Sequence, residues 1–220
     1  MLVDVLSMVE KRYLIFPVRL LNEIFERARS YLEKKNELTV YDPCCGGGYS
    51  LTVLGFFHSD IINHLYGSDI DDDMIFHAKK NVSLLQNKGL NERRNELESL
   101  YAAYGKLSHK EALESLARLE KQLVKPVISD MFSADCTKTL PQLNPDIIIT
   151  DIPYGNLVQW NGDATLSLDT MLEQLIKISE QKMILALCMD KKEKFNAGSW
   201  ILLEKHNIGK TKFIILTNMK

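Results

Sequence analysis

The feature that most restricts the fold of this chain is a repeated alternation between short apolar runs and longer amphipathic segments. The run LTVYD ends at Asp42 and is followed by glycines and then by the apolar segment SLTVLGFF. The run HLYGSD ends at Asp69 and is followed by DDDMIFHAKKNVSLLQ, whose apolar residues recur at helical spacing. Each unit is typical of a strand, a turn and a helix. Such units predict a parallel sheet, because a strand followed by a helix returns to the same sheet through a right-handed crossover.

Further strands are predicted in the second half of the chain. One lies within PVISDMFSA, DIIIT (146–150) is apolar enough to be a central strand buried on both faces, and MILALCM is another buried strand. The segment TLSLDTMLEQLIKISEQ is helical, and the last 22 or so residues predict two strands joined by a tight turn at 207–209. We therefore expect an α/β, Rossmann-like fold: a mostly parallel seven-stranded sheet with one antiparallel C-terminal strand and helices on both faces.

Two further helical segments are predicted outside this alternation. In the N-terminal segment 1–37, apolar residues at three- and four-residue spacing indicate an amphipathic helix that begins near Pro17. Residues 88–124 are charged, lack strand character and divide at Gly105, which predicts an inserted helical hairpin. Ser108 followed by Glu111 is typical of a capping box that opens its second helix. We expect residues 1–220 to form one domain.

Composition indicates an ordinary globular protein. The 220 residues are 45% hydrophobic and 25% charged, and no stretch approaches the roughly 18 uncharged apolar residues that a membrane span needs. The opening segment mixes acids and bases with its apolar residues, so we expect no cleaved signal. No cysteine pair has CxxC spacing, which favours reduced thiols at Cys44, Cys45, Cys136 and Cys188. We expect a cytoplasmic monomer that binds no membrane.

The formal net charge of −2 argues mildly against a nucleic-acid partner, because neutralising phosphates supplies most non-specific affinity. The distribution of charge is more informative. Seven lysines stand between 191 and 220 against Glu193 and Glu204, and seven basic residues lie within the first 35 positions. These clusters are either solvated faces or the places where a nucleic acid binds.

The first motif that indicates chemistry is DPCCGGGYSL, which lies between a predicted strand and helix. Its consecutive glycines let the backbone turn sharply and approach a ligand closely. A Walker phosphate loop is excluded because no Lys-Ser/Thr pair follows, and the dinucleotide fingerprint fits poorly because Leu51 occupies its third glycine position. What remains is the D/E-x-G-x-G-x-G loop of methyltransferases, which predicts cofactor contacts at Asp42, Cys44, Gly46 and Gly48.

The charge of the strand-end acid supports this choice of ligand. S-adenosylmethionine carries an amino group and a sulfonium, and the carboxylate of Asp42 would attract the cationic amino end and repel a phosphate. The alternative is a glycine-rich connector in which Asp42 only caps a helix.

Two later acids extend the predicted cofactor site. Asp69 closes the second strand, where an acid in nucleotide-binding α/β folds accepts both ribose hydroxyls. Asp135, in FSADCT after the third strand, can accept from an adenine amino group. The run 71–73 is better explained as acids at the N-terminus of the next helix.

The second chemical motif is TDIPYG (150–155), directly after the most hydrophobic strand. It is similar to the D/N-P-P-Y/F motif of amino-methyltransferases, in which an acid or amide and a carbonyl accept hydrogens from the target nitrogen and the aromatic ring stacks on the base. Asp151, Pro153 and Tyr154 are therefore the candidate catalytic residues, with Ile152 in place of the first proline. Trp160 is either a second stacking surface or a packing residue. The alternative for the whole motif is a turn capped by Asp151 with Tyr154 in the core.

These segments together resemble the AviRa family of avilamycin-resistance ribosomal RNA methyltransferases. The resemblance rests on FPVRL with EIFERA (16–28), DPCCGGGYSLTVLG (42–55), SDID with AKKN (68–81), the helical insertion, and TDIPYG with a tryptophan nearby. It implies methylation of a guanine in 23S ribosomal RNA with S-adenosylmethionine as donor, in a resistance or housekeeping role. It also places the cofactor at Asp42, Gly46, Gly48, Asp69 and Asp135, and the target base at Asp151 and Tyr154.

The leading hypothesis is thus an enzyme that transfers a methyl group to N1 or N2 of a guanine without a metal, acting on 23S ribosomal RNA or the large ribosomal subunit. One alternative is methylation of another nucleic-acid nitrogen or of a protein amide. Another is a non-catalytic ribosome-binding module that retains the fold.

Overall fold

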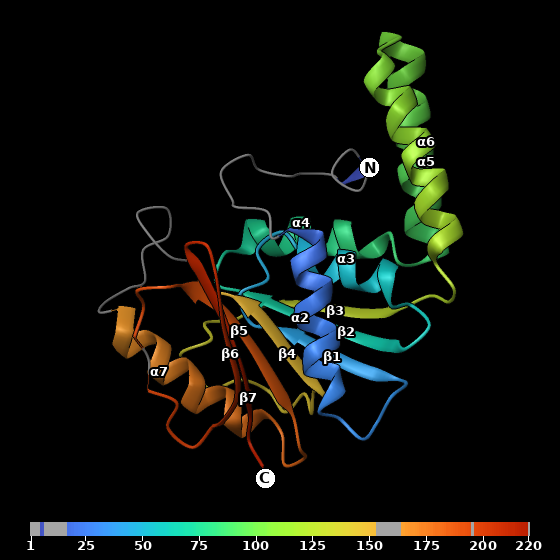
Figure 1. Cartoon of the computed structure of the whole chain (residues 1–220). Helices are drawn as coiled ribbons and strands as arrows, with labels where there is room; N and C mark the ends of the chain where they lie inside the picture. The colour runs from blue at the N-terminus through green and yellow to red at the C-terminus, as the bar shows by residue number, and fades with distance from the viewer. Residues whose placement is uncertain (1–4, 7–16, 153–163, 195, 220) are drawn as a thin grey trace.

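The computed structural model describes residues 5–6, 17–152, 164–194 and 196–219, and it gathers the strands of this part of the chain into one seven-stranded sheet (Figure 1). The strands are β1 (Leu38–Asp42), β2 (Ile62–Asp69), β3 (Ile128–Ser133), β4 (Ile147–Asp151), β5 (Ile184–Asp190), β6 (Ile201–Ile208) and β7 (Thr211–Thr217). The helices are α2 (Val18–Ser30), α3 (Tyr49–Phe57), α4 (Asp72–Ser83), α5 (Asn87–Tyr104), α6 (Leu107–Gln122), α7 (Ala164–Leu175) and the 3-10 helix η1 (Ile176–Ile178).

The strand order is β3-β2-β1-β4-β5-β7-β6, and it confirms the predicted sheet. Strands β1 to β5 are parallel to one another, and β7 runs antiparallel to both β5 and β6. The chain order reverses between β1 and β4, so the carboxyl ends of these two central strands flank the point at which open α/β sheets bind ligands.

Helices cover both faces of the sheet, as predicted. Helices α2, α3 and α4 pack on one face and α7 on the other (Figure 1). The strands β4 and β5 are buried along nearly their whole length because both of their faces are covered. The connection from β3 to β4 contains no helix; its residues Cys136, Leu140 and Leu143 pack against the α7 side of the core instead.

The predicted N-terminal helix is confirmed as α2, with Pro17 as its N-cap residue. Its buried face is the predicted apolar stripe, made of Leu21, Ile24, Phe25 and Ala28. Beside this stripe, the Glu204 carboxylate on β6 accepts hydrogen bonds from Tyr31 (2.8 Å) and Arg27 (3.3 Å). These contacts fasten the helix to the far edge of the sheet.

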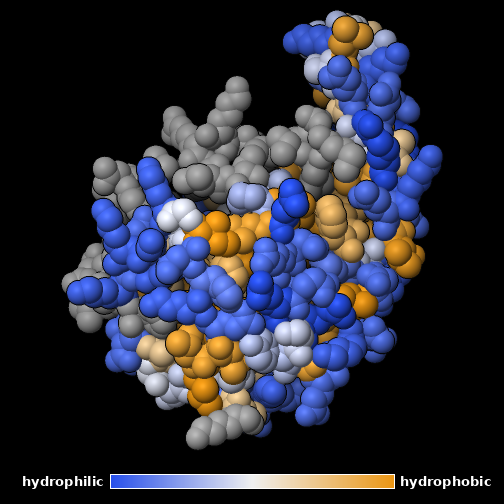
Figure 2. Space-filling view, in the orientation of Figure 1, coloured by the Kyte–Doolittle hydropathy of each residue, from blue (hydrophilic) through white to orange (hydrophobic). Residues whose placement is uncertain are grey.

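The predicted helical hairpin is also confirmed. Helices α5 and α6 pair with each other and project from the body, with a largely hydrophilic surface (Figures 1 and 2). They are separated at Gly105, whose φ of +60° is a left-handed conformation that ends α5. The predicted capping box is wrong: α6 begins at Leu107 with Lys106 as its N-cap and no side-chain cap, so Ser108 lies inside the first turn.

The base of the hairpin holds part of the N-terminal segment. The Arg93 guanidinium donates to the backbone carbonyls of Val5 (2.8 Å) and Leu6 (3.4 Å), and both of these residues are buried.

The turn between β6 and β7 falls at residues 209–210, slightly later than predicted. Within the described ranges, we find no helix of the length and apolar character that crossing a membrane requires.

Candidate functional site

Three carboxylates predicted from the sequence meet at the carboxyl edge of the sheet. Asp42 ends β1, Asp69 ends β2 and Asp151 ends β4. They are close enough for the charges of Asp69 and Asp151 to raise the pKa of Asp42. The three strands are adjacent in the sheet order, so their register brings together groups that are far apart in sequence.

The loop after β1 is held by a hydrogen bond at each successive residue from 44 to 47. Cys44 donates its backbone N–H to Asp42 (3.1 Å) and Cys45 donates to the Ser68 carbonyl (2.9 Å). Gly46 donates to Asp69 (2.9 Å), and the Gly47 carbonyl accepts from the side chain of an α4 residue, Asn81 (2.8 Å). The loop is therefore fixed in shape before any ligand binds.

Two glycines in this loop meet specific backbone requirements. Gly46 and Gly48 have φ values of +49° and +74°, a region that L side chains adopt at a cost. A Cβ at Gly48 would also lie 3.1 Å from the backbone of Ala78 in α4, whereas a Cβ at Gly46 would meet nothing within 4 Å. Gly48 thus permits close packing of the loop on α4, and Gly46 leaves open space where a ligand can approach the backbone.

Asp42 is buried, with 4% of its surface exposed. Burial raises its pKa to about 7, although the Thr150 hydroxyl and the Cys44 amide act in the opposite direction. A cation bound against this carboxylate would favour its charged form. The site therefore suits a positively charged ligand group.

Asp69 is fixed by two backbone amides. Its Oδ2 accepts from Gly46 N and its Oδ1 accepts from Asp71 N at 3.1 Å. Each carboxylate oxygen keeps a further lone pair for a ligand hydroxyl. Asp71 itself caps α4 by accepting from the amides of Asp73 and Met74, as the sequence predicted for this acidic run.

Asp135 lies after β3 in a local turn. Its Oδ1 accepts from both the amide (3.0 Å) and the hydroxyl (2.6 Å) of Thr137, and the hydroxyl contact is the main reason that the pKa of Asp135 is lowered. Its neighbour Cys136 places its Sγ 3.8 Å from the Sγ of Cys44, so the loops after β1 and β3 touch. Both thiols are free, and their contact together with burial raises the pKa of Cys44.

Asp151 has a different environment from the other acids. Burial alone raises its pKa to about 7, and its buried Oδ1 has no hydrogen-bond partner among the described residues. A buried acceptor without a partner is costly unless a ligand supplies the missing donor. Its sequence neighbours Pro153 and Tyr154, and also Trp160, lie outside the described residues.

Three residues with a place in the site were missed from the sequence. Asn81 holds Gly47, the buried Thr150 hydroxyl faces Asp42, and Ile70, which directly follows Asp69, exposes 62% of its surface. An apolar residue directly after a strand-end acid is a signal that could have identified Ile70, since an exposed apolar side chain there suits the flat face of a base. No comparable signal marks the other two, because their roles depend on packing.

The arrangement fits S-adenosylmethionine. Clustered carboxylates suit its cationic amino acid portion and disfavour a bare phosphate, the strand-end Asp69 suits a ribose, and the open side of Gly46 permits close approach of the ligand. The Oδ1 of Asp151, which lacks a hydrogen-bond partner in the part of the chain that the structure describes, lies at the same edge, where it can accept a proton or a hydrogen bond from a second molecule.

Comparison with solved structures identifies proteins of the same fold. The rRNA methyltransferase aviRa from Streptomyces viridochromogenes, at 30% sequence identity, has a TM-score of 0.86, covering 98% of this chain and 90% of that chain. A SAM-dependent methyltransferase from Aquifex aeolicus, at 15% identity, has a TM-score of 0.53 and covers 93% of this chain and 94% of that chain. The second likeness shows the Rossmann-like methyltransferase fold alone.

Comparison with sequences gives the family. A protein from Streptomyces viridochromogenes named 23S rRNA (guanine(2535)-N(1))-methyltransferase is 36% identical over 159 residues, which are 68% of this chain. The aligned part spans 64% of the length of that relative, slightly under two thirds. A family model described as rRNA methyltransferase AviRa matches residues 4–211. On this match, the chain belongs to the AviRa family.

Proposed function

We propose that this chain is an S-adenosylmethionine-dependent methyltransferase that modifies a guanine base nitrogen in 23S ribosomal RNA. The observation that carries the proposal is the buried Oδ1 of Asp151, which has no hydrogen-bond partner among the described residues, at the same sheet edge as the hydrogen-bonded loop after β1. Of the two nitrogens that the sequence left open, N1 is favoured, because the curated relative is named for that atom. The name of the solved relative supports ribosomal RNA as the substrate.

The geometry of the carboxyl edge of the sheet supports the cofactor roles that we propose. Asp42 holds the cationic amino group, Asp69 accepts the ribose hydroxyls, and Asp135 accepts from the adenine amino group. The backbone at Cys44, Gly46 and Gly48 forms the wall against which the cofactor lies. When bound, S-adenosylmethionine supplies a methyl group on a positively charged sulfur.

Asp151 has the properties required of a proton acceptor. N1 of a neutral guanine carries a hydrogen, which must leave when the nitrogen gains a methyl group. The pKa of about 7 at Asp151 makes this carboxylate a stronger base than an exposed aspartate, yet leaves it about half ionised at neutral pH. Pro153 and Tyr154 complete the same motif, and we assign Tyr154 to stacking on the target base.

Replacing Asp151 tests this role. We expect Asp151→Asn to lower kcat for 23S ribosomal RNA by about 100-fold or more, in the range that general acid-base groups contribute, because the amide cannot take the proton. Binding of S-adenosylmethionine, measured by calorimetry, should be retained. Asp130→Asn is a matched control, because that side chain is 63% exposed on β3 and contacts His64. Full activity of Asp151→Ala, with cofactor binding lost in Asp42→Ala, would contradict the assignment.

The acceptor is tested separately. Transfer of a labelled methyl group should occur to 23S ribosomal RNA and not to DNA or protein, and primer extension should stop sharply at the modified base, because an N1-methyl group blocks pairing. Label in DNA or protein would favour another nitrogen as the target. Failure to bind S-adenosylmethionine at all would favour a non-catalytic ribosome-binding module.

The organisation of the protein is also part of this proposal. We propose that residues 1–220 act as one cytoplasmic, monomeric domain, with 88–124 as an insertion. Light scattering that gave a mass near twice 25.2 kDa would contradict the monomer.

A further inference from the structure

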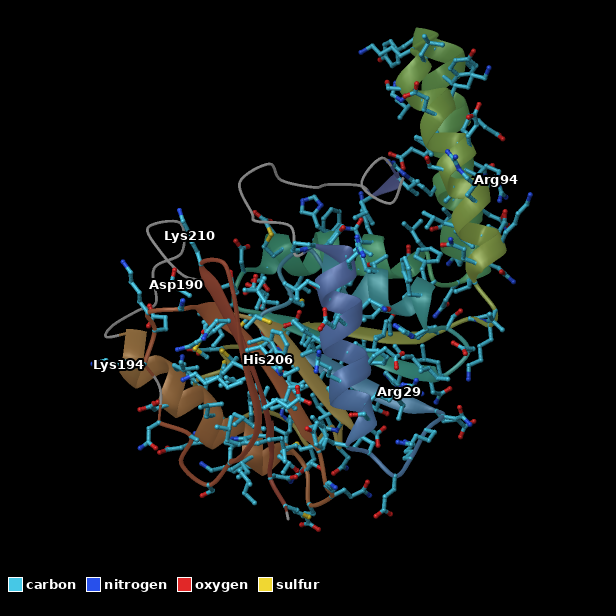
Figure 3. The ribbon with its side chains drawn as sticks, in the orientation of Figure 1. Arg29, Arg94, Asp190, Lys194, His206 and Lys210 are labelled. Atoms are coloured by element: carbon cyan, nitrogen blue, oxygen red, sulfur yellow. The ribbon has the colours of Figure 1, made fainter. Side chains whose placement is uncertain are left out.

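A group of lysines meets beyond the carboxyl end of β5. Lys191, Lys192 and Lys194 follow this strand directly, and Lys210 lies in the turn between β6 and β7. All four side chains are exposed, and the backbone N–H of Lys191 donates to the Lys210 carbonyl at 2.8 Å. Figure 3 shows Lys194 and Lys210 on the same side of the molecule as Asp190. We call these four residues the lysine cluster.

The cluster consists of four exposed lysines close together in space, and none of them is neutralised by an ion pair within the described ranges. Many described lysines and arginines are neutralised, for example Lys34 by Asp146 (2.8 Å) and Arg94 by Glu120 (2.6 Å). Within the described ranges, no carboxylate forms an ion pair with a member of the lysine cluster. Two acids lie in the same stretch: Asp190 accepts the backbone N–H of Lys192 at 2.8 Å, and Glu193 forms no ion pair with these lysines. The cluster therefore presents positive charge to solvent on a chain whose formal net charge is −2.

The backbone under the cluster is held in place. Glu193 N donates to the Asp190 carbonyl (3.1 Å), and the side chain of Lys212 on β7 donates to the Glu193 carbonyl. Strand pairing places Asp190 opposite Thr211, so the end of β5 and the β6–β7 turn form one continuous surface. The backbone that carries the four lysines is therefore held in place by hydrogen bonds.

The position of the cluster relates it to the candidate site. Asp151 is paired with Cys188 on β5, and Lys191 lies only three residues further along. At about 3.3 Å per residue, Lys191 is on the order of 10 Å beyond the level of Asp151 along the strand direction. The cluster therefore borders the edge at which Asp42, Asp69 and Asp151 meet.

We propose that the lysine cluster binds backbone phosphates of the RNA strand next to the target nucleotide. The inference rests on the proposed function and adds to it the place where the substrate is held. A base that enters a site near Asp151 must leave its stack, and its flanking backbone must be held while it does so. Lysines supply charge without reading sequence, so the cluster positions the strand and leaves recognition of the base to other residues.

A pair of double variants tests this surface. Lys191→Gln/Lys210→Gln removes two charges whose backbones touch, and Lys177→Gln/Lys182→Gln removes two exposed charges near the opposite end of β5. The probe is a fragment of 23S ribosomal RNA, with binding measured across a salt series and methylation measured at steady state. For the cluster variant, we expect the slope of log affinity against log salt to fall by about 2, close to one per lost phosphate contact.

Kinetics and cofactor binding complete the test. The cluster variant should raise KM for the RNA by about 10-fold or more with kcat unchanged, while affinity for S-adenosylmethionine and the melting temperature stay at wild-type values. The control variant should keep the wild-type slope and KM. Equal losses in both variants would overturn the proposal, because they would show a general effect of net charge. A fall in kcat at unchanged KM would also overturn it.

The two proposals fail in distinguishable ways. If the wild-type protein binds the RNA fragment but methylates no RNA, the proposed function is wrong, and the salt slope still decides the role of the cluster. If methylation is normal and the slope is unchanged in the cluster variant, only the cluster proposal is wrong. Unchanged RNA binding with cluster-dependent binding of polyglutamate would assign the surface to an acidic protein instead.

Discussion

At the scale of single residues, the buried carboxylate of Asp42 suits a cationic cofactor but lowers the stability of the free protein when it is charged. Its pKa is about 7 in the folded protein and near 4 in an unfolded chain, so the folded state binds this proton more tightly. Its favourable contribution is present below about pH 4 and is lost as pH rises towards 7, because the charged form is disfavoured by burial. Above that range the free protein carries a buried charge that Thr150 and the Cys44 amide compensate only in part, and a cationic ligand group would stabilise it further.

We therefore expect Asp42→Asn to raise the melting temperature of the free protein at pH 8, by a few degrees if about 1 kcal/mol is recovered. The gain should shrink at pH 5, where the wild-type carboxyl is already protonated. Binding of S-adenosylmethionine should be lost at both values. Differential scanning calorimetry at the two pH values measures the effect, with the exposed Asp60→Asn as control. An equal gain at pH 5 and pH 8 would contradict the electrostatic explanation.

Single residues were predicted unevenly from the sequence. Asp42 and Asp69 could be predicted because each is the last residue of an apolar run, and strand ends meet at one edge of a parallel sheet. Asn81 and Thr150 could not, because they act through neighbours that only packing supplies. The environment of Asp151 was equally inaccessible, since burial and not sequence determines its pKa.

At the scale of elements, the site is a loop fastened to three different pieces of secondary structure. Its bonds reach Ser68 and Asp69 on β2, Asp42 on β1 and Asn81 on α4. Such multiple attachment keeps the loop in one conformation, so little ordering is required when a ligand binds.

Removing one of these hydrogen bonds should weaken cofactor binding more than it lowers the stability of the fold. We expect Asn81→Ala to raise the Kd for S-adenosylmethionine by roughly 5- to 10-fold, since one net hydrogen bond is worth about 1 kcal/mol. Titration calorimetry measures the change, and Asn63→Ala, at an exposed position on β2, is the matched control. Wild-type affinity in Asn81→Ala would show that the loop keeps its shape without this bond.

Prediction at this scale succeeded where patterning is strong. The buried strands β4 and β5 and the helix α2 follow their apolar periodicity, and Gly105 divides the hairpin as predicted. The predicted start of α6 was wrong because a Ser-x-x-Glu pattern specifies a cap only if its serine is the N-cap residue, and the N-cap of α6 is Lys106, two residues earlier. No sequence pattern indicated that the connection from β3 to β4 lacks a helix.

At the scale of the whole molecule, the sheet consists of two parts that are separate in sequence. One part contains β1 to β3 and the other β4 to β7, and they meet where Val40 pairs with Ile147. Within the first part, helices α4, α5 and α6 lie between β2 and β3 along the chain. Pairing of β1 with β4 therefore closes a loop of the chain that contains every element from α3 to β3.

This pairing gives the projecting hairpin a role in the rate of folding. Because α5 and α6 pair locally, their distant ends come together early, and the loop that β1 and β4 must close becomes effectively shorter. Replacing residues 88–122 by a flexible Gly/Ser chain of equal length should therefore slow refolding by about 2-fold, because the loop between Val40 and Ile147 lengthens from about 70 to about 105 residues. Stopped-flow fluorescence would measure this, with a short Gly/Ser link in place of the hairpin as the control that should refold at the wild-type rate. An insertion that has already folded into a hairpin lengthens the polypeptide but hardly slows the pairing of β1 with β4.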